Sequence, residues 1–185
     1  MNKRKILPTG VLAVSGLFLL SKEALADSPL PTPTVRTVWS MDKKFCAVMN
    51  PDKKIITVYR VSKDGKKTAL WAMYGWFRVA GLSNNGKHLV AGHGGMNLLP
   101  LNHKKDEVML YFFNEGELIN YVTLDQLIKD QSNLQRTVSH LHWGNYLGFD
   151  EEGRYIVETV ENHKIAFDVT TGKPHNHITS PKGQN

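Results

Sequence analysis

Two histidines, His140 and His142, are spaced so that both could bind one metal ion. In a β-strand, residues two apart face the same side of the sheet, about 7 Å from each other. Imidazole nitrogens are common zinc ligands, but a zinc site needs at least a third protein ligand. Candidates for that ligand are His93, Glu158 and His163. Because nothing in the sequence brings them together, the pair predicts either a zinc site or two histidines that face solvent or bind backbone carbonyls.

The glycine-rich segment 92–96 exposes backbone amides that could approach an anion. It resembles the His-Gly-Gly element of esterase oxyanion holes, but the partner motif Gly-x-Ser-x-Gly is absent from the sequence. We therefore expect these glycines to end a strand and to begin an irregular loop over 94–106. That loop contains Met96, Leu98 and Leu99, an apolar group that must tuck onto the domain or contact a partner.

Aromatic side chains are dense between residues 71 and 77. They are Trp71, Tyr74, Trp76 and Phe77. Alternation along strands would bury about half of these rings, because large rings dominate small β cores. A groove of exposed rings could instead grip a peptide or a glycan. We take Trp76 as the candidate binding residue of this group, together with Met96, Leu98 and Leu99.

Short apolar runs separated by glycine, asparagine and aspartate turns predict one all-β domain over residues 35–173. Only residues 124–130 have apolar spacing typical of a helix, and that helix would be short. The expected strands are 35–40, 44–49, 54–61, 68–74, 77–82, 87–92, 107–113, 117–122, 137–148, 154–160 and 164–169.

The same order of strands and turns occurs three times in the sequence. Ser40, Ser83 and Asp150 each precede a tight turn that ends in a basic residue, and an apolar strand follows. Each unit continues with a second strand and a glycine turn, at 64–66, 114–117 and 171–173. Asn-Gly and Asp-Gly supply the positive φ angles of tight hairpins. The sequence therefore predicts three antiparallel meanders, whose apolar runs are long enough to be covered on both faces.

This order of strands and turns resembles a blade of the β-propeller repeat proteins, of the WD40 or YVTN kind, over nearly all of residues 35–173. The resemblance implies a fold, an antiparallel meander of blade-like hairpin repeats, and no particular activity. Propellers have four to eight blades of about 40 residues, so three units cannot close the usual ring. We favour a face-to-face sandwich, which needs no partner. The alternative is an incomplete propeller that self-association of two chains completes.

The first 26 residues have the three-part composition of a secretory signal peptide. A basic start at 3–5 precedes the apolar run 6–20, and residues 24–26 read Ala-Leu-Ala, the pattern that a signal peptidase cleaves. The apolar run is shorter than the roughly 20 residues of a membrane helix, so we expect no membrane span after processing. The prediction is a periplasmic or extracellular protein.

Processing would remove four basic residues and Glu23, which lowers the net charge of +6 by three. The remaining charges alternate in sign, so we expect no nucleic-acid partner. The lone cysteine, Cys46, cannot form an internal disulfide and is expected to be buried in its apolar run. Prolines make residues 27–34 an extended arm, and residues 174–185 are expected to form a flexible tail.

These features favour an exported, non-enzymatic binding or interaction protein of the cell envelope. Its partner would be a protein or another envelope component, and inhibitors and immunity factors are two forms that such proteins take. The alternative is a metal-binding protein or metal-dependent hydrolase that uses His140 and His142, with zinc as the cofactor. Apart from zinc in this alternative, the sequence predicts no cofactor.

Overall fold

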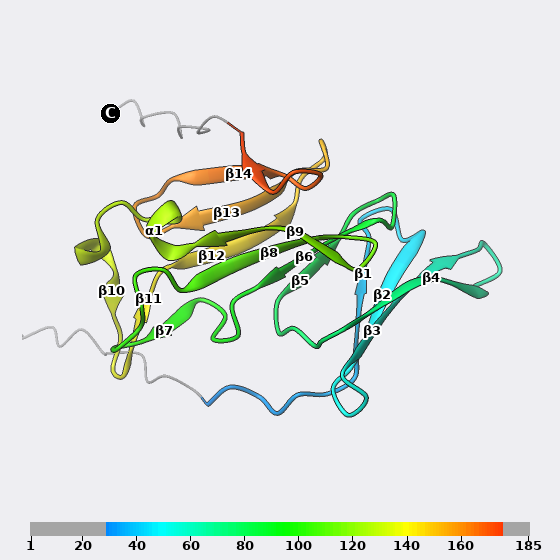
Figure 1. Cartoon of the computed structure of the whole chain (residues 1–185), viewed down its shortest axis with the longest axis horizontal. Coiled ribbons are helices and arrows are strands. Elements are labelled where there is room, and N and C mark those ends of the chain that lie inside the picture. The colour runs from blue at the N-terminus through cyan, green and yellow to red at the C-terminus, as the bar shows by residue number, and fades with distance from the viewer. Residues whose placement is uncertain (1–28, 176–185) are drawn as a thin grey trace, which may run out of the picture.

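The computed structural model describes residues 29–175, which form three successive four-stranded antiparallel sheets (Figure 1). We call these sheets blades 1, 2 and 3. Blade 1 contains β1 (Arg36–Trp39), β2 (Phe45–Asn50), β3 (Ile55–Val61) and β4 (Lys67–Tyr74). Blade 2 contains β5 (Ala80–Leu82), β6 (His88–Gly92), β8 (Val108–Asn114) and β9 (Glu117–Thr123). Blade 3 contains β12 (Gly144–Phe149), β13 (Tyr155–Thr159), β14 (Lys164–Asp168) and β15 (Lys173–Pro174).

A small fourth sheet is built from two insertions in this repeat. Its strands, in spatial order, are β10 (Gln135–Arg136), β11 (His140–His142) and β7 (Leu98–Pro100). One insertion contains β7 and follows β6 in the sequence, before β8. The other insertion connects blades 2 and 3, and it contains β10 and β11 as well as α1 (Leu124–Leu127) and η1 (Gln131–Asn133). These insertions explain why the repeats are unevenly spaced. No helix within residues 29–175 is long and apolar enough to cross a membrane.

Blade 2 lies between the other two blades and is apolar on both faces (Figure 1). Leu89 on β6 shares a buried cluster with Ala47 of blade 1. Its neighbour Val90, on the opposite face of β6, shares a second cluster with Val157 of blade 3. All of β6 is buried, as the apolar run predicted. The three blades therefore pack face to face in chain order, with blade 2 in the middle. This arrangement of blade-like antiparallel sheets confirms the predicted all-β fold class.

The first turn of each blade repeats one hydrogen-bonding pattern. Ser40 Oγ donates to Asp42 Oδ1 at 2.7 Å and accepts the Phe45 amide at 3.0 Å. Ser83 makes the same two hydrogen bonds in blade 2, at 2.6 Å and 3.0 Å. In blade 3, Asp150 takes the place of the serine and accepts the backbone amide four residues later at 2.8 Å. The residues with positive φ in these turns are Lys43, Gly86 and Gly153, at 60°, 70° and 77°. The repeat predicted from the sequence is thus confirmed.

The expected strand 137–148 is wrong as a single element. β11 and β12 belong to different sheets, and the chain turns between them at Gly144, whose φ is 153°. A Cβ at Gly144 would lie 2.2 Å from the Glu158 carbonyl oxygen, so only glycine allows β12 to start this close to β13. The expected strand 77–82 is shorter, at Ala80–Leu82, and the expected helix ends at Leu127.

The loop expected over 94–106 is partly ordered, because β7 pairs with β11 within it. β10 and β15, with two residues each, were also not predicted. Residues 29–34 form no strand, and the Thr34 carbonyl accepts the Trp76 indole N–H at 2.9 Å. The predicted tail over 174–185 begins with ordered residues, because Pro174 belongs to β15 and the His175 amide donates to the Ala166 carbonyl at 2.8 Å. The predicted signal peptide, residues 27 and 28, and residues 176–185 lie outside the described residues.

Candidate functional site

The outer face of blade 1, which we define as the face turned away from blade 2, is an apolar surface. One row of hydrogen-bonded neighbours across the four strands is Trp39, Cys46, Tyr59 and Ala69. The next row is Thr37, Val48, Thr57 and Ala72, and Ile55 pairs with Tyr74 beyond it. Tyr74 is 80% exposed and Trp39 is 39% exposed.

The register shows that blades 2 and 3 use the same face to pack on the preceding blade. The rows equivalent to Trp39–Cys46–Tyr59 are Leu82–Leu89–Phe113 in blade 2 and Phe149–Tyr155–Phe167 in blade 3. The blade 2 row is buried against blade 1, and the blade 3 row is packed against blade 2. Leu82 and Tyr155 are 1% and 2% exposed. Blade 1 thus carries a packing face of the same apolar character, and within residues 29–175 that face has the exposed rings of Trp39 and Tyr74.

A single cation lies over the aromatic row of this face. Lys67 Nζ is 5.8 Å from the Trp39 ring centroid and 6.0 Å from that of Tyr59, distances at which an ammonium is attracted by ring faces. Cys46 lies between Trp39 and Tyr59 in this row, and it is a free cysteine that is fully buried. Burial raises the pKa of the Cys46 thiol above its ordinary value, so the thiol is protonated and packs as a small apolar group.

The outer face of blade 3, which points away from blade 2, has smaller side chains at its centre. Gly148, Ile156 and Ala166 form one row across three strands. The next row is Asn145, Glu158 and Lys164, and Lys164 Nζ lies 3.9 Å from Glu158 Oε1. Ile156 and Gly148 are half-buried, and the bulged residue Leu147 is 48% exposed.

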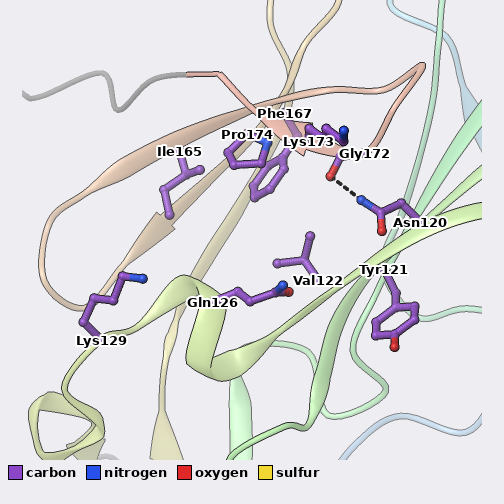
Figure 2. Close-up of a pocket in the computed structure, with 10 residues that line it drawn as sticks. All are labelled: Asn120, Tyr121, Val122, Gln126, Lys129, Ile165, Phe167, Gly172, Lys173 and Pro174. Atoms are coloured by element: carbon purple, nitrogen blue, oxygen red, sulfur yellow. Dashed lines mark hydrogen bonds between the residues drawn. The ribbon is translucent and has the colours of Figure 1, made fainter.

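A cavity of about 460 Å³ lies between the outer strands of blades 2 and 3 (Figure 2). Its apolar wall is formed by Val122, Ile165 and Phe167, which are all buried. Lys129 and Lys173 contribute cationic side chains to the lining. Asn120, also in the lining, donates from Nδ2 to the Gly172 carbonyl at 3.0 Å and so joins the two blades beside the cavity. The size lies within the range of small-molecule sites.

The apolar residues predicted to bind a partner lie in different environments. Met96 is exposed, and its carbonyl accepts the Trp143 indole N–H at 2.9 Å. Leu98 is half-buried, whereas Leu99 is fully buried in the core shared by blades 2 and 3. β7 alternates, so Leu99 points into the core and Leu98 to the opposite side. In the described chain, therefore, Leu99 offers no surface to a partner.

Trp76, the fourth predicted binding residue, contacts other residues of the same chain. Its indole N–H donates to the Thr34 carbonyl, and the Arg78 guanidinium lies 5.4 Å from its ring centroid. Arg78 also donates to the Pro31 carbonyl. The segment 31–34 thus lies along Trp76.

His140 and His142 are on one strand, in register with Pro100 and Leu98 of β7. His140 Nδ1 lies 2.8 Å from Ser139 Oγ, and His142 Nδ1 is buried without a hydrogen-bond partner. His93 and His140 line one cavity of about 240 Å³. Residues 29–175 contain no group of three or more His, Cys, Asp or Glu placed to hold a metal ion. Glu158 and His163 do not line this cavity.

The outer face of blade 1 was not predicted as a site, although its residues were visible. Trp39, Ile55, Tyr59 and Tyr74 lie in predicted strands, and alternation places them on one side. The sequence does not show which side of each strand packs against a neighbouring sheet. The structure shows it, because the equivalent rows of blades 2 and 3 are buried.

No protein-family model matches the chain, and no curated protein matches it significantly. Solved structures similar to it include the C-terminal WD40 domain of Sif2, at 18% identity and a TM-score of 0.37, over 78% of this chain and 37% of that one. A putative 6-phosphogluconolactonase from Bacteroides fragilis is similar at 18% identity and a TM-score of 0.39, over 78% and 37%. The periplasmic gluconolactonase of Pseudomonas aeruginosa is similar at 14% identity and a TM-score of 0.40, over 81% and 41%.

The similarity to each of these structures is weak, at 18% identity or less. The chain spans less than half the length of each of these three structures. The fold itself is defined by the blade-like sheets described above.

Proposed function

We propose that the protein is an exported, non-enzymatic binding protein, and that it binds another protein through the outer face of blade 1. The observation that carries this proposal is the exposed row containing Trp39 and Tyr59, whose equivalents in blades 2 and 3 are buried against a neighbouring sheet. The residues 1–26 support export.

The composition of the face suits a protein partner. Its two central rows contain only apolar, aromatic, cysteine and threonine side chains, and Lys67 lies beside them, opposite Val61. Interfaces are enriched in aromatic residues and poor in charges at their centre, and large rings are frequent sites of high binding energy. A partner that covers Trp39 and Tyr74 would bury rings that are now in water.

A photo-reactive amino acid at position 74 tests this proposal in cells that export the protein. We expect cross-links from position 74 to a protein surface, and their loss when Trp39→Arg is added. Position 138, where an exposed valine lies outside the three blades, is the matched control and should give none. Equal cross-linking from both positions, or none from position 74, would contradict the proposal.

The cavity between blades 2 and 3 favours a second candidate function, the binding of a small amphipathic anion. Its buried apolar wall would hold a hydrocarbon or ring, and Lys129 and Lys173 would attract an acidic group. Binding of an anionic fluorescent sulfonate to the parent, and its weakening when both lysines are replaced by alanine, tests this candidate.

A further inference from the structure

We infer that the protein which covers the outer face of blade 1 is a second copy of this chain, which applies the outer face of its blade 3. The inference rests on the proposed function, because it names the partner of the same face. In this arrangement two copies close a six-bladed ring through two equivalent junctions.

The junction between blades 2 and 3 shows how these faces fit. Between blades 2 and 3, the row that begins with Phe149 and Tyr155 packs on a face that contains Gly81 and Val90. A Cβ at Gly81 would lie 2.8 Å from Cε2 of Tyr155 and 3.0 Å from Cε2 of Phe149. The missing side chain therefore makes room for the two rings of the next blade.

The same position in blade 3 is also a glycine. Gly148 pairs with Ile156 as Gly81 pairs with Val90. Gly148 has a φ of 89°, and apart from its two chain neighbours no residue has an atom within 4 Å of a Cβ built there, so this position on the outer face of blade 3 has space for a ring. The blade 1 residue equivalent to Phe149 is Trp39. A second copy could therefore place Trp39 over Gly148.

The surfaces around this junction have compatible polarity. The outer face of blade 3 offers Ile156 and the exposed Leu147 to the apolar rows of blade 1. The turns at one end of blade 1 carry lysines at positions 43, 44, 63, 66 and 67 against Asp42 and Asp64, and Lys44 pairs with Asp42. The first turn of blade 3 carries three acidic residues at 150–152, and Arg154 pairs with two of them, Asp150 and Glu152. An excess of positive charge therefore remains at this end of blade 1, and an excess of negative charge at the same end of blade 3. Opposite charges at matching ends favour this orientation, because like charges would meet if two blade 1 faces packed together.

Symmetry limits the number of copies. Each chain has one outer face of each kind, so the contact is head-to-tail, and such contacts generate either rings or open filaments. Two copies give six blades, within the four to eight that propellers use, whereas three copies would give nine. In each chain the dimer also covers both outer faces, that of blade 1 and that of blade 3.

Sedimentation equilibrium of the processed chain tests the inference. We expect the mass of a dimer, and at least a tenfold weaker association for Trp39→Arg and for Ile156→Arg. Val138→Arg is the matched control and should leave the dimer unchanged. Far-ultraviolet circular dichroism spectra like that of the parent, together with cooperative urea unfolding, would show that the two variants remain folded; their midpoints should be lower, because association stabilises the parent.

The orientation is tested with single cysteines in a Cys46→Ala background. A mixture of Trp39→Cys and Ile156→Cys chains should give cross-linked dimers with a short thiol-specific reagent, whereas neither variant alone should. Cross-linking of Trp39→Cys with itself would overturn the head-to-tail arrangement. A monomer at every concentration would overturn the inference, while cross-links from position 74 to a different protein would leave the proposed function standing.

Discussion

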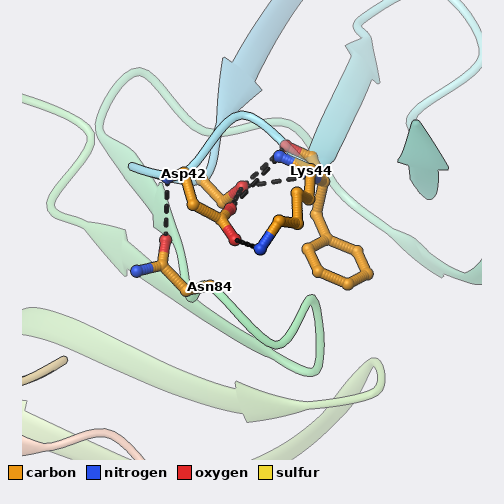
Figure 3. Close-up of polar contacts among 5 residues, drawn as sticks. Asp42, Lys44 and Asn84 are labelled. Atoms are coloured by element: carbon orange, nitrogen blue, oxygen red, sulfur yellow. Dashed lines mark hydrogen bonds and ion pairs between the residues drawn. The ribbon is translucent and has the colours of Figure 1, made fainter. Parts of the chain in front are cut away.

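The side-chain oxygen of Asn84 accepts the backbone N–H of Asp42 at 3.1 Å (Figure 3). This hydrogen bond joins the first turn of blade 2 to the first turn of blade 1. Asp42 in turn accepts the Lys44 amide at 3.1 Å and lies 3.2 Å from the Lys44 ammonium. The two turns are thus hydrogen-bonded to each other at one end of the interface between the blades.

Asn84→Ala should destabilise the protein by about 1 kcal/mol, the net value of one hydrogen bond. Asn84→Asp keeps an acceptor at the same place and should cost less. Equilibrium urea unfolding of both variants measures the difference. Equal midpoints for the parent and Asn84→Ala would show that water replaces this hydrogen bond without loss.

Gly81→Ala should destabilise the protein by about 1–3 kcal/mol, the usual effect of adding a methylene to a packed core. The reason is the close approach of Tyr155 and Phe149 to this glycine. Gly94→Ala is the control, since a Cβ there meets nothing within 4 Å and Gly94 has no positive φ. Urea midpoints that fall equally in both variants would contradict the tight fit at Gly81.

The turn chemistry of this chain made most of the fold predictable. Serine or aspartate at 40, 83 and 150, with glycine or lysine three residues later, fixes the hairpins because few residues tolerate positive φ. One detail misleads a sequence alignment. The first turn of blade 3 is one residue shorter than the first turn of blade 2. Tyr155, which pairs with Phe149, is therefore the equivalent of Leu89, which pairs with Leu82. A shift of one residue moves every side chain to the other face.

The candidate site was less predictable, because it depends on contacts between segments far apart in sequence. β7 and β11 are each three residues long and exist through their mutual pairing. Local propensity therefore could not show that Leu99 is buried or that His93 and His140 share a cavity. The outer face of blade 1 needed the register of all three blades before it could be recognised.

Acid should destabilise the protein through two histidines. Burial lowers the pKa of His88 and of His93 below the ordinary 6.5. Below pH 6.5 the unfolded chain therefore binds more protons than the folded one, and stability falls as the pH drops through the lowered values. The urea midpoint should decline from pH 7 to pH 5, and His93→Gln should flatten that decline. A decline as steep in His93→Gln as in the parent would contradict the role given to His93.

An anionic fluorescent dye should bind the cavity between blades 2 and 3. We expect anilinonaphthalene sulfonate to bind the folded protein with one site, and the double variant Lys129→Ala, Lys173→Ala to weaken binding several-fold, because each lysine lines the cavity. Lys104→Ala with Lys105→Ala, outside this cavity, removes the same charge as a control. If both double variants weaken binding equally, the dye responds to net charge and not to the cavity.

The Cys46 thiol should be protected by the outer face of blade 1. It is fully buried and lies in the row between Trp39 and Tyr59, and a protonated thiol is a poor nucleophile. Reaction with a disulfide reagent at pH 8 should therefore be slow in the folded protein and fast in urea. Trp39→Ala should speed the reaction of the folded protein at least tenfold by uncovering the sulfur, whereas Leu118→Ala, on the exposed outer strand of blade 2, should not. A thiol that reacts equally fast in the folded and unfolded states would show that this face does not cover it.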